Sequence, residues 1–518
     1  MKHSCLFFLA PMAFIAFSCT NVKIDETPEK TVVVDPELLP DTTFSSVEAL
    51  SYDIEIVDTT VSGNLKFTHS EYTDTLSALT FRGNPFRNAD FHATVKGRPT
   101  KIVKDWEFET GMGKPSSFGG SWMGGNGWSG QPLYVQWPDS IAQLMKKAPG
   151  VTAEFDSTEV IVSSMCGEIY FLNPKTGKQT RKPLDGGAVL KGTASLDPSY
   201  NGNLYVGQGV AWQGDVMGNQ AFNLYKMERT FYNPHDPKAR RGWNAFDSSA
   251  ICAGGFLFWA SENGTLYKYI RENGTIRLHS ALRYTVNGYT PGMESSIAVY
   301  SNYGYVSDNG GNVLCINLNT LKPVWRYDNH DDSDPSPIIE LENGVPFVYT
   351  CCEVDKRGTN QPARLVKLNG LTGQEVWCNE EVCERWHRGG NDYSDGGYFA
   401  TPLLGKGNCE NMIFATPCKH GKEQGHFLAI DRKTGKEIYR TKLKRYVWSS
   451  MVGFYNEKNE LYIFLGDCIG NVYLIEGKTG KIIYTEAVGN NFEATPVAFG
   501  NSVVLGTRGN KIYKLSLQ

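Results

Sequence analysis

The sequence lacks the short motifs that mark several common catalytic sites. It contains no HExxH, Walker A or GxSxG pattern, and no CxxC pair with the spacing of a zinc site. It also lacks an excess of basic residues, because 51 Lys and Arg stand against 55 Asp and Glu, a formal net charge of -4. The sequence therefore predicts neither these enzyme classes nor nucleic-acid binding.

Long apolar runs are also scarce. One run, Leu6 to Phe17, follows a short charged start and ends just before Cys19. It is too short for a bilayer span of about 20 residues, but it matches the apolar region of an export signal. We expect residues 1–18 to be a lipoprotein signal peptide and Cys19 to carry the lipid. An ordinary signal peptide is the alternative, and no later stretch is apolar enough to span a membrane.

The segment after the signal is rich in Thr, Asp, Glu and Pro, as in "DETPEKTVVVDPELLPDTT". We expect residues 19–77 to form a tether and N-terminal extension, with a short strand within 51–61. The predicted location is the cell envelope, as an outer-membrane lipoprotein facing the periplasm or the cell surface. The predicted membrane contact is the lipid anchor.

A disulfide framework is not indicated either. Of the 12 cysteines, Cys5 and Cys19 belong to the signal region, which leaves ten in about five hundred residues. Most of these lie in apolar, strand-like runs, and we expect them to be small core residues. Cys351 and Cys352 stand side by side and need a separate explanation.

What the sequence does contain is glycine, aromatics and repeats. Gly 54, Tyr 26, Phe 26 and Trp 11 suit short strands and tight turns. The stretches "GEIYFLNPKTGKQTR", "HFLAIDRKTGKEIYR" and "GNVYLIEGKTGKIIY" are copies of one hairpin unit, at spacings near 50 residues. Each follows two further strand-like runs, so the unit is a four-stranded antiparallel propeller blade.

Counting these units predicts an all-β, eight-bladed β-propeller over residues 78–518. The predicted blades start near residues 128, 191, 247, 293, 334, 396, 448 and 493. The last unit stops one strand short, and we expect "KIVKDWEFETG" (101–111) to supply its outer strand and close the ring. Trp106 then matches the positions of Trp325 and Trp377.

These repeats resemble the pyrroloquinoline-quinone-like propeller family. "AIDRKTGKEIYR" and "KLNGLTGQEVW" follow the family's A-x-D-x-x-T-G-x-x-x-W docking motif, in which the tryptophan packs between blades. The resemblance implies the fold but leaves the function open. The family includes quinoprotein dehydrogenases and also cofactor-free lipoproteins, such as the propeller subunit of the outer-membrane β-barrel assembly machinery.

The adjacent cysteines test the dehydrogenase alternative. In those enzymes such a pair lies on the cofactor face, before the second strand of a blade. Here Cys351 and Cys352 end "VPFVYTCC", the second strand of blade five, and we expect them to be packed at a strand end. We therefore expect no cofactor, with calcium or pyrroloquinoline quinone as the open alternative. The acidic stretch 329–336 is expected to be a solvated loop.

One set of polar residues recurs just before the inner strands. Its members are Asp247, Glu294, Asp334, Asp395 and Glu493, and Trp128, Trp243, Trp386 and Trp448 lie in nearby loops. Equivalent positions in different blades converge on one mouth of the channel. Carboxylates beside aromatic faces suit a cation, a basic peptide segment or a polyol. The alternative is that these residues only cap the inner strands.

The sequence thus favours a non-enzymatic envelope lipoprotein that binds or scaffolds envelope proteins or glycans at the channel mouth. A quinoprotein-type dehydrogenase or a carbohydrate-active envelope enzyme is the alternative. No catalytic residue is predicted, and a metal site is left open.

Overall fold

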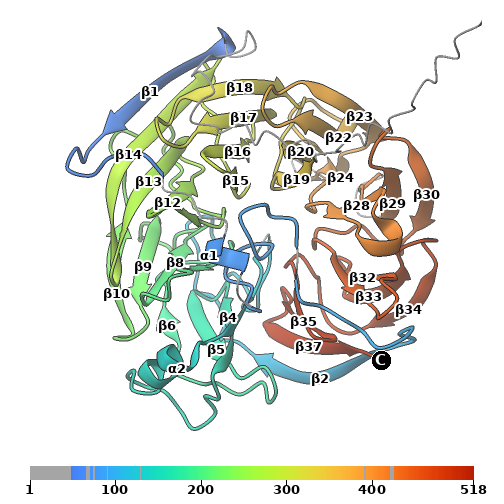
Figure 1. The fold of residues 1–518 in the computed structure, drawn as a ribbon, viewed down its shortest axis with the longest axis horizontal. Coiled ribbons are helices and arrows are strands. Elements are labelled where there is room, and N and C mark those ends of the chain that lie inside the picture. The colour runs from blue at the N-terminus through green and yellow to red at the C-terminus, as the bar shows by residue number, and fades with distance from the viewer. Residues whose placement is uncertain are drawn as a thin grey trace, which may run out of the picture.

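Eight blades of four antiparallel strands, one of them extended by a fifth strand, stand in a closed ring around a central channel (Figure 1). The computed structural model describes residues 48–65, 70–73, 76–89, 91–128, 130–389, 392–419 and 425–518. The predicted signal peptide and Cys19 lie outside these residues. Each inner strand begins four to seven residues after a predicted blade start. The predicted all-β, eight-bladed propeller is confirmed.

The strands of each blade run outward from the channel in chain order. Blades one and two are β3 (Leu133–Gln136), β4 (Thr158–Ser163), β5 (Glu168–Leu172), β6 (Leu184–Asp185), and β7 (Ser195–Leu196), β8 (Asn203–Gly207), β9 (Asn219–Asn223), β10 (Glu228–Asn233). Blades three and four are β11 (Ile251–Ala253), β12 (Phe256–Ala260), β13 (Thr265–Glu272), β14 (Thr275–Val286), and β15 (Ala298–Tyr300), β16 (Tyr303–Ser307), β17 (Asn312–Asn317), β18 (Pro323–Asp328).

The second half of the ring has the same order. Blades five and six are β19 (Ile338–Glu342), β20 (Val345–Cys351), β22 (Gln361–Asn369), β23 (Glu375–Cys383), and β27 (Leu403–Leu404), β28 (Met412–Ala415), β29 (His426–Asp431), β30 (Glu437–Lys442). Blades seven and eight are β31 (Val452–Tyr455), β32 (Leu461–Gly466), β33 (Asn471–Glu476), β34 (Ile482–Ala487), and β35 (Val497–Phe499), β36 (Ser502–Gly506), β37 (Lys511–Leu517), β2 (Ile102–Glu109).

The remaining elements are short. They are the helices α1 (Ser70–Thr73), α2 (Asp139–Met145) and η3 (Gly407–Cys409), and the strand pairs β21 (Glu353–Val354) with β26 (Gly396–Gly397) and β24 (Trp386–Gly389) with β25 (Asp392–Ser394). Among the described residues, no helix is long and apolar enough to cross a membrane.

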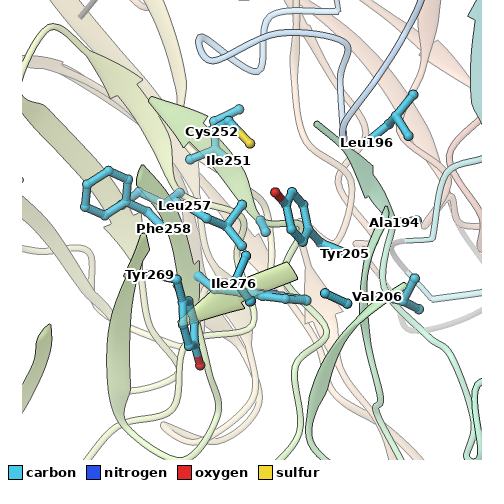
Figure 2. Packing of buried hydrophobic residues seen from close by; sticks show 14 of the residues in the cluster. Ala194, Leu196, Tyr205, Val206, Ile251, Cys252, Leu257, Phe258, Tyr269 and Ile276 are labelled. Atoms are coloured by element: carbon cyan, nitrogen blue, oxygen red, sulfur yellow. The ribbon is translucent and has the colours of Figure 1, made fainter. Parts of the chain in front are cut away.

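The burial of the strands explains their sequence pattern. A middle strand such as β33 is buried on both faces, because a neighbouring blade covers each face, and it reads as a nearly continuous apolar run. The outermost strand β34 is half-buried to exposed and carries polar residues. Figure 2 shows this packing between blades two and three, where Tyr205 of β8 lies beside Leu257 of β12.

Neighbouring blades are joined by an aromatic ring that lies on a glycine turn. Trp377 on the outer strand of blade five covers Gly435 in the Thr-Gly turn of blade six, and its Nε1 donates to the carbonyl of Arg432 at 3.0 Å. A Cβ on Gly435 would lie 2.8 Å from the indole ring, and its φ is +71°. Glycine is needed there on both grounds. Trp325 and Gly373 repeat the arrangement one blade earlier, with Cβ to ring at 2.7 Å.

The ring closes with a strand from the N-terminal side. β2 pairs antiparallel with β37, in register from Ile102 opposite Leu517 to Glu109 opposite Lys511. Trp106 covers Gly177 of blade one and donates to the carbonyl of Pro174 at 3.1 Å. The predicted closure by residues 101–111 is confirmed, and with it the inter-blade packing of the tryptophans.

Part of the N-terminal extension packs against blade three. The expected short strand is β1 (Leu50–Ile56), which pairs with β14 as a fifth strand. Glu55 on β1 forms an ion pair with Arg283 at 2.9 Å. These residues are therefore part of the folded ring.

A segment that the repeat pattern does not contain fills the centre of the ring. Residues 78–89 and 91–95, here called the plug, cross the channel and lie between α1 and β2 in the chain (Figure 1). The main chain of Val299 in blade four donates to the carbonyl of Pro85, and that of Ile339 in blade five donates to the carbonyl of Phe86. The plug thus has main-chain contacts with several blades at once.

Two fully buried arginines, Arg82 and Arg87, fix the plug. Their guanidinium groups donate to main-chain carbonyls of Ser249 (blade three), Ile297 (four), Pro402 (six) and Met451 (seven). Burial lowers the pKa of Arg82 to about 9 and that of Arg87 to about 10, so both stay charged at neutral pH. Two positive charges therefore stand at the centre of the ring.

The docking of Trp377 on its glycine generates a direct test. We expect Gly435→Ala to lower the free energy of unfolding by about 2–4 kcal/mol, because a methyl group would add overpacking to left-handed backbone strain. Gly288→Ala is the matched control, since Gly288 has φ +82° and no atom within 4 Å of its added Cβ. Thermal unfolding of both variants measures the difference, and equal losses would contradict the role given to the indole.

Candidate functional site

A belt of small hydroxyl side chains surrounds the channel where the inner strands begin. The belt residues of blades three to seven are Ser249, Ser296, Ser336, Thr401 and Ser450. In each successive pair the main-chain N–H of one residue donates to the hydroxyl oxygen of its counterpart in the next blade, at 2.8 to 3.1 Å. The small residues of "DSSA", "MESS" and "FATP" are therefore connections between blades.

The side chains two residues before the belt form the channel mouth. In blades two to eight they are Lys191, Asp247, Glu294, Asp334, Phe399, Trp448 and Glu493. The ring is thus acidic over some blades and aromatic or basic over others. Asp395 does not occupy the equivalent position in blade six, because it lies six residues before Thr401 and Phe399 stands there instead.

A cavity of about 210 Å³ opens inside this mouth. Its lining combines carboxylates, aromatic rings and belt hydroxyls. The carboxylates are Glu294, Asp332, Asp334, Glu353, Asp355 and Asp395, the aromatic residues are Phe81, Trp128, Phe399 and Trp448, and the hydroxyls are Ser336, Thr401 and Ser450. Phe81 belongs to the plug, which blocks the channel beneath the cavity. We call this cavity the acidic cup.

The structure brings five of the predicted residues together in the cup: Glu294, Asp334, Asp395, Trp128 and Trp448. The indole Nε1 of Trp128 reaches Glu294 across the channel at 3.4 Å. Trp128 also has φ +54°, a backbone conformation that is rare for a bulky residue. This conformation places its ring over the mouth.

Three other predicted residues lie elsewhere. Asp247 is paired with Lys191 beside the cup. Glu493 accepts from Arg508 at 2.9 Å and lines a neighbouring groove.

Trp243 packs on Phe118, with ring centroids 5.1 Å apart, and is not part of the cup lining. Its indole instead packs against a buried apolar cluster that includes Val210 and Trp212. The side chain of Trp386 lies outside the described residues.

Sequence reasoning missed three of the cup carboxylates, Asp332, Glu353 and Asp355. They come from the loop before β19 and from β21 with the turn that follows it, two segments that Asp331 holds together. Its carboxylate accepts from the main-chain N–H groups of Asp355, Lys356 and Arg357, at 3.1, 3.0 and 3.1 Å. Asp331 is buried, so the prediction that 329–336 is a solvated loop is wrong. In the sequence, Glu353 and Asp355 directly after the two cysteines could have indicated these cup carboxylates.

Negative charge in the cup exceeds the positive charge that faces it. Asp332 pairs with Lys356 at 2.6 Å, and Asp355 and Asp395 share Arg385 at 2.7 and 2.8 Å. No lysine or arginine among the described residues forms an ion pair with the other three carboxylates, Glu294, Asp334 and Glu353.

Burial of these groups shifts their protonation. It raises the pKa of Asp332 to about 7 and that of Asp355 to about 6, against the pull of Lys356. It also raises the pKa of Asp334 and of Glu353 well above the ordinary carboxyl range, and nearby carboxylates add to both shifts. The cup therefore holds protons near neutral pH that an incoming cation would displace.

A second carboxylate group adjoins the cup. Oxygens of Asp247, Glu262 and Glu294 lie within 4.8 Å of one another. An all-oxygen donor set of this kind could hold a hard cation such as Ca²⁺. The ammonium of Lys191 already supplies one positive charge there, since it pairs with Asp247 and lies 4.2 Å from the centroid of the Trp128 ring.

The residues present do not fit pyrroloquinoline quinone. Cys351 ends β20, and Cys351 and Cys352 are buried free thiols that are not part of the cup lining. Burial raises the pKa of Cys352 to about 12 and that of Cys351 well above its usual value. The quinone is itself a polycarboxylate, so a carboxylate-lined cavity would repel it. The expected packing of this pair at a strand end is confirmed.

The raised carboxyl pKa values give a stability prediction. The folded protein binds the Glu353 proton more tightly than the unfolded chain, so its stability falls as pH rises from about 4 through the raised pKa. We expect Glu353→Gln to raise the free energy of unfolding at pH 8 by on the order of 1 kcal/mol, and to change it little at pH 4. Denaturant unfolding at both pH values measures this.

Glu381 provides the matched control. It is equally buried but pairs with Arg440 at 2.8 Å, and the ion pairs outweigh burial and lower its pKa to about 2. Glu381→Gln should therefore lose stability at pH 8. A loss of stability in Glu353→Gln at pH 8 would contradict the raised pKa of Glu353.

Known proteins were compared with the chain in sequence and in fold. No family model matches. The outer membrane protein assembly factor BamB of Kangiella koreensis is 28% identical over 154 residues, which are 30% of this chain and 31% of that protein. The match thus spans less than a third of the curated relative's length.

Solved structures share the whole ring. The quinohemoprotein alcohol dehydrogenase of Comamonas testosteroni has a TM-score of 0.58 at 13% identity, over 86% of this chain and 81% of that one. Quinohemoprotein alcohol dehydrogenase ADHIIG of Pseudomonas putida HK5 has a TM-score of 0.56 at 11% identity, over 85% and 80%. At these identities the likeness concerns the fold alone. The chain is an eight-bladed β-propeller that shares its fold with these quinohemoprotein alcohol dehydrogenases.

Proposed function

We propose that this protein is a non-enzymatic propeller of the cell envelope that binds a cationic partner in the acidic cup. The observation that carries the proposal is the charge of the cup: six carboxylates line it, and Lys356 and Arg385 pair with three of them. A cavity with one excess sign of charge and low-dielectric walls attracts the opposite charge. The partner is therefore a basic segment of another envelope protein.

The envelope part of the proposal has separate support. The local identity is to a protein named as an outer membrane assembly factor, and the apolar run before Cys19 suits an export signal. Residues 1–18 would be removed, Cys19 would carry the lipid, and the following segment would hold the ring away from the membrane. We do not propose a dehydrogenase, because the carboxylate-lined cup does not suit an anionic quinone.

The cup is tested by its effect on partner capture. We expect full-length protein to retain an envelope partner from detergent extracts, and Glu294→Gln with Asp334→Asn to lose most of it, because two carboxyl groups that could face an incoming cation as carboxylates are removed at nearly constant size. Mass spectrometry identifies the partner, and the purified partner then gives the affinity. Asp215→Asn is the control, a like charge change on the exposed loop between β8 and β9. Equal capture by the double variant and the control would contradict the proposal.

The anchor is tested separately. Cys19→Ala removes the thiol that would be lipidated, so we expect the protein to move from the membrane fraction to the soluble fraction. Fractionation and immunoblotting measure this, with Cys166→Ala as a control at a cysteine within the ring. Membrane retention of Cys19→Ala would refute the lipid anchor.

A further inference from the structure

The molecule already holds one ammonium group at the edge of the cup. Lys191 is 6% exposed, its ammonium pairs with Asp247, and it lies 4.2 Å from the centroid of the Trp128 ring. A carboxylate and an indole face together suit an ammonium, because the ion pair is joined by attraction to the ring quadrupole. The contacts of Lys191 thus show that a carboxylate and an indole at the edge of the cup bind an ammonium group.

The cup itself presents the same two kinds of group. Trp448 and Phe399 form an aromatic wall, with ring centroids 4.9 Å apart. Asp334 and Glu353 line the cavity from blade five, and no lysine or arginine among the described residues pairs with either. We infer that the cup takes the side-chain ammonium of a lysine from the partner, an inference that rests on the proposed function.

An unsatisfied atom points to the same ligand. Glu353 is 5% exposed and lines the cup, yet its Oε1 has no hydrogen-bond partner among the described residues. A buried carboxylate oxygen without a donor is unfavourable, and a ligand that donates hydrogen bonds removes that cost. An ammonium brings three donors on one atom.

The arrangement of the carboxylates favours an ammonium over a guanidinium. Glu294 comes from blade four, and Asp334 and Glu353 come from blade five, so the acceptors approach from different directions. A compact point charge with rotatable donors suits such a set, whereas a planar guanidinium prefers both oxygens of one carboxylate.

The walls of the cup favour an alkylammonium over a metal ion. Indole and phenyl rings cannot serve as ligands to Ca²⁺, which takes six to eight oxygens. They can cover the apolar stem of a lysine side chain while its charged end reaches the carboxylates. A cavity of about 210 Å³ accommodates that stem and its terminal ammonium.

The test uses full-length protein and short blocked Gly/Ser peptides that contain one lysine, one Nε-acetyl-lysine or one arginine. We expect calorimetry to show one-to-one binding of the lysine peptide, affinity at least about tenfold weaker for the arginine peptide, and no binding of the acetylated peptide. Glu353→Gln and Trp448→Leu should each weaken the lysine peptide by about fivefold to tenfold. Asp215→Asn should leave its affinity unchanged. Unfolding midpoints of all variants confirm that each is folded.

The outcomes separate this inference from the proposed function. Tighter binding of the arginine peptide or of CaCl₂ alone, lost in Glu353→Gln, would overturn the lysine assignment and leave an acidic cation-binding cup. Lysine binding that Trp448→Leu does not weaken would overturn the aromatic wall as part of the site. Partner capture that depends on Glu294 and Asp334 without any lysine-peptide binding would also overturn the inference while the proposed function stands.

Discussion

The whole ring depends on an aromatic side chain of one blade lying on the glycine of the next. Each blade is a twisted four-stranded sheet with two large apolar faces, and it is stable only when a neighbour covers each face. The indole of Trp377 fits Gly435 because no Cβ intervenes, and its N–H satisfies a carbonyl of the same turn. The same contact joins Trp325 to Gly373 and, where the ring closes, Trp106 to Gly177. Closure by β2 leaves no free sheet edge between the last blade and the first.

Closure of the ring creates the central channel. The plug fills this channel, and the acidic cup lies at its mouth. Arg82 and Arg87 donate to carbonyls of four blades and so hold the inner strands in position. The plug residue Phe81 also lines the cup, so the segment that these arginines hold in place forms part of the cup wall. The six carboxyl groups of the cup outnumber the two cations that pair with them, and this is why we propose the cup as a binding site.

The adjacent cysteines show why a motif needs its place in the fold. Cys351 and Cys352 resemble the pair of the quinoprotein dehydrogenases in letters, but β20 runs up to the mouth and buries both thiols between blades. The chain then turns, and the residues that follow them enter the cup. Glu353 directly follows the cysteine pair and lines the cup. Its carboxyl group suits a cation, whereas the cysteine pair suggests a quinone.

The sequence by itself determined the ring. Copies of one hairpin in phase, the Thr-Gly turns and the matching position of Trp106 predict eight blades and their closing strand, because these features recur at equivalent places in several blades. It also placed Glu294, Asp334 and Trp448 at the mouth for the same reason. Only the tertiary structure decided the rest of the cup. Asp332 and Glu353 lie on blade-five segments outside the repeat, Phe399 replaces Asp395 at the ring position, and Trp243 turns to an apolar neighbour. The direction of a loop side chain depends on partners distant in sequence, such as the carboxylate of Asp331 and the plug, and no periodic pattern contains them.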